Sequence, residues 1–100
     1  MIQSNFKIVF SEEAELDLLD AVKHYNKIKK ALGARLKAEV KSFASKIKKN
    51  PTFASVKYKN TRTVACKIFP YSIHYEIDLD QKTTRITAIF HFSKKPFWDL

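Results

Sequence analysis

Residues 69–78, FPYSIHYEID, decide the fold. After the proline, apolar and polar side chains alternate, as they do along a strand that buries one face. The buried face is predicted to hold Ile73, Tyr75, Ile77 and Leu79, and the opposite face Ser72, His74, Glu76 and Asp78. Proline cannot donate a ladder hydrogen bond, so Pro70 belongs at the start of the strand. The segment is therefore predicted to be a strand entered through a corner at residues 69–71.

Upstream of this strand, a first strand and a helix are predicted. Residues 6–10 alternate, with Phe6, Ile8 and Phe10 on the buried side. Ser11 is a good N-cap, and the two glutamates after it favour the positive end of a helix dipole. Apolar residues then recur every three or four positions, which predicts a helical stripe of Ala14, Leu18, Val22, Tyr25, Ile28 and Leu32.

A second helix follows closely. Gly33 is the only glycine, and it marks either the break between the helices or the start of the second one. The second stripe comprises Leu36, Val40, Phe43, Ala44 and Ile47. Asn50 and Pro51 end this helix, because the residue before a proline is pushed out of the helical region. Two helices with a short join predict an antiparallel hairpin packed on a sheet.

Three more strands are predicted after a loop at residues 51–59. They span residues 62–68, 72–79 and 84–92, and the short polar connection 80–83 makes the last two a hairpin. In the last strand, alternation places Ile86, Ala88, Phe90 and Phe92 on one face and Arg85, Thr87, Ile89 and His91 on the other. The predicted fold class is α+β, one domain over residues 1–100 with the order β-α-α-β-β-β. Its helical hairpin packs on one face of a mainly antiparallel four-stranded sheet.

Composition narrows the class of protein. The chain is 45% hydrophobic and 29% charged, which is typical of a globular domain. No apolar run reaches the roughly 18 residues of a membrane helix, and the first residues lack the features of a signal peptide, so we expect a cytoplasmic protein. Cys66 is the only cysteine, and it is expected to pack as a small hydrophobe rather than to form a disulfide or a zinc site.

The net charge of +9 indicates an anionic partner: nucleic acid, a ribosome or an acidic protein segment. Residues 23–49 contain ten lysine and arginine residues but only one acidic residue, Glu39. Two interpretations stay open for this run. It is either a solvated helix face or a surface that approaches RNA, DNA or an acidic partner.

Several side chains with acid, base or cationic chemistry are predicted on the sheet face away from the helices. Alternation gathers there Lys67, His74, Glu76, Arg85 and His91, with Arg62 and Lys94 near the ends. Metal-free RNA cleavage needs a base, an acid and cations for the charge on phosphorus, which such a set provides. The alternative is that these are ordinary solvent-facing residues. His74 and His91 have no third potential ligand at a spacing typical of a metal site, so no metal is expected. No cofactor is expected either.

Several segments together resemble the RelE/ParE toxin superfamily. They are the run at 31–36 after a helix with Tyr25, the stop at 49–51, Arg62, the stretch 69–75, and the ending 88–91 with Pro96 and Trp98. The resemblance covers nearly the whole chain. It implies the toxin of a type II toxin–antitoxin pair, neutralised by a cognate antitoxin and associated with growth inhibition and plasmid stabilisation.

The resemblance leaves the cellular target open between two groups. Members like RelE cut messenger RNA on the ribosome, whereas members like ParE inhibit DNA gyrase and have no established nuclease site. The 69–71 corner and the C-terminal histidine resemble the ParE side, which implies a gyrase inhibitor that is not an enzyme. The first alternative is a ribosome-dependent endoribonuclease, with Arg62, His91 and Lys94 as its catalytic residues. The second alternative is an inactive member that acts only as a binding module.

One departure from the family pattern lies near the C-terminus. Where the family has His-x-Ser-Arg-x-Pro, residues 91–96 read HFSKKP, so Lys94 stands in place of an arginine. Lysine keeps the positive charge but cannot make the bidentate hydrogen bonds of arginine to a phosphate or carboxylate. The target-facing candidates are Lys67, His74, Glu76, Arg85 and Lys95, and the antitoxin-binding candidates are Leu16, Leu19, Phe97 and Trp98. The alternative for these last four side chains is that they pack in the core. No membrane partner is expected, and no sequence-specific DNA binding by the toxin alone.

Overall fold

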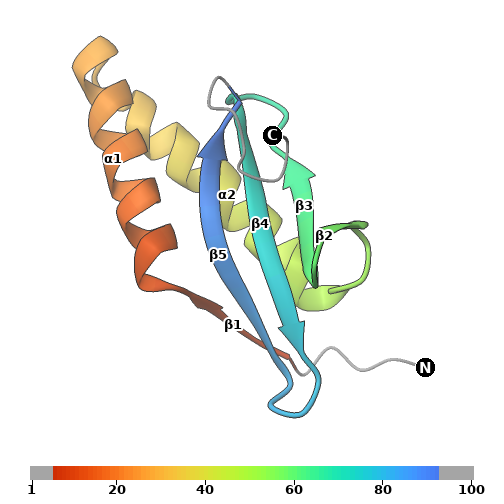
Figure 1. The fold of residues 1–100 in the computed structure, drawn as a ribbon. Coiled ribbons are helices and arrows are strands. Elements are labelled where there is room, and N and C mark those ends of the chain that lie inside the picture. Colours follow the sequence, from red (N-terminus) through yellow and green to blue (C-terminus); the bar gives the residue numbers. More distant parts are fainter. Residues whose placement is uncertain (1–5, 93–100) are drawn as a thin grey trace.

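The computed structural model describes residues 6–92, which form two helices against one face of a five-stranded sheet (Figure 1). The elements are β1 Lys7–Phe10, α1 Glu12–Ile28, α2 Leu32–Lys49, β2 Val56–Tyr58, β3 Thr61–Ala65, β4 Tyr71–Asp78 and β5 Thr83–His91. The strand order is β1-β5-β4-β3-β2, with β1 parallel to β5 and every other pair antiparallel. The predicted α+β fold is confirmed. Within residues 6–92, neither helix combines the length and the apolar character needed to cross a membrane.

The sheet has five strands rather than the predicted four, because β2 lies in the segment that was expected to be a loop. This strand is only three residues long and pairs antiparallel with β3 at the edge of the sheet. Lys59, in the turn between them, adopts a positive φ of 47°. Three residues are too few for alternation to be recognised, so only the pairing with β3 identifies this strand.

The helical hairpin begins and ends as predicted. The Ser11 hydroxyl caps α1 by accepting from the Ala14 N–H at 3.0 Å, and α2 ends at Lys49, before Asn50. Ala31, not Gly33, takes the left-handed conformation in the join, with φ of 72°. A Cβ on Gly33 would lie 2.6 Å from the Val22 carbonyl oxygen. The glycine is therefore required by the close approach of α2 to α1 and not by a turn.

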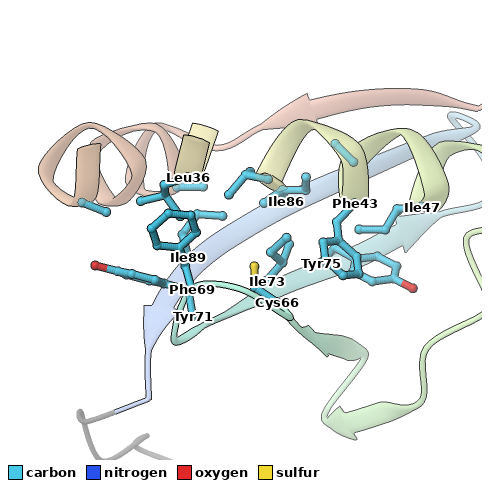
Figure 2. Packing of buried hydrophobic residues seen from close by; sticks show 14 of the residues in the cluster. Leu36, Phe43, Ile47, Cys66, Phe69, Tyr71, Ile73, Tyr75, Ile86 and Ile89 are labelled. Carbon is cyan, nitrogen blue, oxygen red and sulfur yellow. The ribbon is translucent and has the colours of Figure 1, made fainter. Parts of the chain in front are cut away.

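The core lies between the helices and the sheet (Figure 2). Leu36, near the start of α2, lies at the end of the core that also holds Phe69 and Ile89 (Figure 2). Phe43 and Ile47, further along α2, lie at the end that holds Tyr75. The side chains of Leu36, Ile47 and Tyr75 are fully buried. The Tyr75 hydroxyl donates to the Pro51 carbonyl at 2.7 Å, so its one polar group is satisfied inside the core.

Two side chains predicted for the core lie outside it. Ile28 is exposed at the end of α1, and Leu79 follows the end of β4 and is also exposed. Ile28 is the last residue of α1 and Leu79 lies just past β4, so the periodic pattern of each element continues to a position that is not packed.

A β-bulge in β5 changes which side chains face the helices. Tyr75 pairs with Ile86 and His74 pairs with Ala88, so Thr87 is an extra residue. A single extra residue inverts the alternation beyond it. The predicted faces are therefore wrong from residue 88 onward: Ile89 is buried on the helix side, and Ala88 and Phe90 lie on the opposite face.

Side chains from the start of α1 satisfy the backbone around this bulge. Ser11 donates its hydroxyl to the Thr87 carbonyl at 3.2 Å, and the Asp17 carboxylate accepts the Ile89 N–H at 3.0 Å. The bulge thus depends on contacts between residues more than seventy positions apart in the chain.

Candidate functional site

His74 lies on the sheet face opposite the helices, as predicted, but it is buried rather than exposed to water. Its side chain is 1% exposed and lies beside the rings of Tyr58 and Phe90. Its Nδ1 is 3.1 Å from the Tyr58 hydroxyl, and its Nε2 is 3.1 Å from the Ser72 hydroxyl. Burial lowers the pKa of His74 to about 4. The imidazole is therefore neutral near pH 7 and shapes this face instead of presenting a charge.

Glu76 and Arg85 occupy the same face, as predicted, and are exposed. They are directly opposite one another on β4 and β5, and Glu76 also accepts a hydrogen bond from the Thr61 hydroxyl at 3.3 Å. Asp78 and Asp80 line the same depression as this pair. Carboxylates outnumber the single arginine, so this end of the face does not favour a phosphate.

Arg62 lies on the helix side of the sheet, which corrects the predicted face. It pairs with Tyr75, whose side chain is in the core, and its Nη1 donates to the Ala54 carbonyl at 2.6 Å. Its guanidinium therefore holds the segment between α2 and β2.

His91 also lies on the helix side, because the bulge inverts the end of β5. It pairs with Tyr71, and the two rings meet edge to face with their centroids 4.9 Å apart. The partners of Arg62 and His91 on β4 are four residues apart, which is about 13 Å along a strand. Arg62 and His91, two of the three residues proposed for RNA cleavage, therefore do not converge on one phosphate.

Acidic and histidine side chains surround His91. It lines a depression of about 460 Å³ with Asp17, Asp20, His24 and Tyr71. Burial, and then the neighbouring Tyr25, raise the pKa of the Tyr71 hydroxyl. Across residues 6–92, no group of three or more histidine, cysteine or acidic side chains is arranged to hold a metal. The carboxylates make this depression better suited to a basic side chain than to a phosphodiester.

Lys67 is not on the open face, because β3 ends at Ala65 and Lys67 belongs to the turn before β4. Its exposed side chain lines a depression beside α2. The remaining candidates, Lys94, Lys95, Phe97 and Trp98, lie outside the described residues.

Sequence reasoning did not find the role of Glu39, which organises this turn. Its carboxylate accepts three consecutive backbone N–H groups, from Lys67 at 2.8 Å, Ile68 at 2.9 Å and Phe69 at 3.1 Å. Burial acts to raise the pKa of the Glu39 carboxyl, but the three donors outweigh it and the pKa is lowered. One signal was available: Glu39 is the only acid in a run of bases.

Cys66, at the start of this turn, is buried as predicted. Burial, and then the Glu39 carboxylate, raise the pKa of its thiol to about 12. A thiol with this pKa is not a nucleophile at neutral pH.

Leu16 and Leu19 are exposed on α1, at 56% and 49%, so neither belongs to the core. Val9 on β1 is also exposed, and β1 is an edge strand. Exposed apolar side chains and an edge strand are both features that a protein partner can use.

A family model described as the ParE toxin of the type II toxin–antitoxin system parDE matches residues 8–96. The chain therefore belongs to the ParE toxin family, within the RelE/ParE superfamily. It is a toxin of the type II toxin–antitoxin class. A search of curated protein sequences found no significant match.

Three solved structures share the fold. The chromosomal ParDE system from P. aeruginosa superposes with a TM-score of 0.77 at 13% identity, over 89% of this chain and 98% of that one. The RelBE2 toxin–antitoxin complex from Mycobacterium tuberculosis gives 0.63 at 20% identity, over 89% and 93%. The archaeal RelE–RelB complex from Pyrococcus horikoshii gives 0.55 at 8% identity, over 90% and 98%.

Proposed function

We propose that this toxin is neutralised by a cognate antitoxin and acts on DNA gyrase in the cytoplasm. The observation that carries the proposal is the match of residues 8–96 to the ParE toxin model, which extends from β1 past the end of β5. Two of the three similar structures are RelBE-type complexes, so the messenger-cleaving alternative has structural relatives as well.

The positions of the candidate catalytic residues favour gyrase over messenger cleavage. Cleavage needs an acid, a base and a cation within reach of one phosphodiester. Arg62 is bonded to a backbone carbonyl, His91 faces α1, and His74 is buried and neutral. Within residues 6–92, these side chains do not form a common site. Lys94, the third proposed catalytic residue, lies outside that range.

The proposed antitoxin contact includes Leu16 and Leu19 on α1. Antitoxin segments are commonly amphipathic and acidic, so they suit exposed leucines on a protein with a net charge of +9. Phe97 and Trp98 stay antitoxin-binding candidates. The target-facing proposal keeps Glu76 and Arg85 on the open face, which His74 supports from beneath. It also keeps Lys67, in the turn beside α2, and Lys95.

The choice of target is tested with purified toxin in two parallel assays. One follows supercoiling of a relaxed plasmid by gyrase, and the other follows cleavage of a messenger on programmed ribosomes. We expect supercoiling to be inhibited, the inhibition to be relieved by antitoxin, and the messenger to stay intact. Cut messenger with unchanged supercoiling would replace this proposal with the endoribonuclease. No effect in either assay, together with tight antitoxin binding, would favour the inactive binding module.

A further inference from the structure

The outward side of α2 carries an unusual concentration of positive charge. Six exposed bases stand along its eighteen residues, and we call them the α2 cationic face: Arg35, Lys37, Lys41, Lys46, Lys48 and Lys49. The one acid of this helix, Glu39, is turned inward and accepts three backbone N–H groups of the turn before β4. The helix therefore presents cations without interspersed surface carboxylates.

No side chain of the α2 cationic face forms an ion pair with any residue in the described range 6–92. The Lys46 ammonium lies 5.4 Å and 5.7 Å from the ring centroids of Phe43 and Phe53. Cation–π contacts leave the charge in place. The acids of α1 lie in its first half, and those of the sheet lie on β4 and the turn that follows it.

The spacing of the cations places them on two flanks of the helix. At 3.6 residues per turn, Lys37, Lys41 and Lys48 share one flank, and Arg35, Lys46 and Lys49 share the other. The ridge between the flanks carries only small side chains: Ala34, Ala38, Ser42 and Ser45. A helix with side chains is about 10–12 Å across. The major groove of B-DNA is about 12 Å wide and has a row of phosphates on each wall.

The chemistry of this face favours nucleic acid over a protein partner. Lysine is depleted at protein–protein interfaces, whose affinity comes from aromatic, arginine or apolar anchors. The ridge of α2 has no such anchor, whereas exposed leucines stand on α1. Lysine ammonium groups suit phosphates as point charges, and short side chains on the ridge reach few base edges.

From these observations we propose that the α2 cationic face binds the phosphate backbone of duplex DNA without reading its sequence. The inference goes beyond the proposed gyrase target and does not depend on it. It assigns α2 a direct contact with DNA that the toxin makes by itself.

The test measures binding of the purified full chain to a fluorescent duplex of about 20 base pairs with scrambled sequence, from about 50 to about 200 mM salt. The informative variant is Lys37→Gln/Lys41→Gln/Lys48→Gln, which removes one flank and keeps helix propensity. We expect affinity at low salt to fall on the order of a hundredfold. We also expect the slope of log K against log salt to become shallower by about 0.9 for each phosphate that the variant no longer neutralises, or about 2.7 in all.

The matched control is Lys7→Gln/Lys57→Gln/Lys82→Gln, which removes the same charge from exposed positions of the sheet and its turns. Circular dichroism verifies that both variants are folded. The control is expected to keep the salt slope of the parent. Equal losses of affinity in the two variants would overturn the proposal, because binding would then follow net charge alone. So would tighter binding of a poly-glutamate peptide than of DNA at the same salt, which would assign the face to an acidic protein.

Discussion

His74 shows how one residue combines a correct prediction of its face with a wrong prediction of its environment. Alternation along residues 69–78 placed it opposite the core, and that is where it lies. The expectation that it meets water was wrong, because Tyr58 and Phe90 lie beside it and both ring nitrogens are within hydrogen-bond distance of hydroxyls. Periodicity predicts the face of the sheet on which a side chain lies. Its exposure to solvent also depends on the side chains of the neighbouring strands, which periodicity does not give.

The buried imidazole predicts a pH-dependent stability. The pKa of His74 is about 4 in the fold against an ordinary 6.5, so between these values the unfolded chain binds a proton that the folded chain does not. This contribution is complete above about pH 6.5 and is lost as the pH falls through about 4, for a total on the order of 3 kcal/mol.

His74→Gln removes the titration and retains hydrogen-bonding capacity. The free energy of unfolding of this variant, from urea titrations at several pH values, is expected to fall less steeply than that of the parent below pH 6.5. His24→Gln, at an exposed position on α1, serves as the control and should follow the parent. Parallel curves for parent and His74→Gln would contradict the prediction.

Between elements, Glu39 is the link that ties α2 to the turn before β4. The turn exposes Ile68 and buries Cys66 and Phe69, and its three N–H donors converge on one carboxylate. The corner at residues 69–71 was predicted from Pro70 alone. The helix residue that holds this corner in place is thirty positions upstream.

Glu39→Gln is expected to lower the free energy of unfolding by about 1–3 kcal/mol, because the amide nitrogen cannot accept the N–H that one carboxylate oxygen accepts now. Urea denaturation measures the change. Asp80→Asn, at an exposed position after β4, removes the same charge and should stay within about 0.5 kcal/mol of the parent. A destabilisation no larger than that of the control would show that the three hydrogen bonds contribute little.

At the scale of the whole molecule, apolar, cationic and acidic side chains occupy different parts of the surface that the structure describes. Exposed leucines stand on α1, cations cover the outward side of α2, and carboxylates gather around the end of β4. Under the two proposals above, the antitoxin and DNA would contact different sides of the part of the chain that the structure describes.

Leu16→Ser/Leu19→Ser is expected to weaken antitoxin binding at least tenfold, because it replaces the two apolar side chains of the proposed antitoxin contact with short polar ones. Stability should change little, since neither side chain is in the core. Calorimetric titration with antitoxin measures the affinity, and gyrase inhibition by the free toxin should persist. Ile28→Ser, an exposed apolar site at the end of α1, is the control. Unchanged affinity in the double variant would remove α1 from the antitoxin interface.

The sequence by itself determined the order of the main elements, the N-cap of α1, the end of α2, the faces of β4 and the resemblance to the toxin superfamily. The structural features follow from local signals: the proline at residue 70, the N-cap at Ser11, and apolar periodicity. The family followed from the resemblance of several segments to known toxins, not from these signals. Only the tertiary structure decided the bulge at Thr87, and with it the face on which His91 lies. The reason is that Ser11 and Asp17, far away in the chain, satisfy the backbone that the bulge leaves without ladder partners. In the same way, only tertiary packing decided that Glu39 turns inward and leaves the outer side of α2 to its cations.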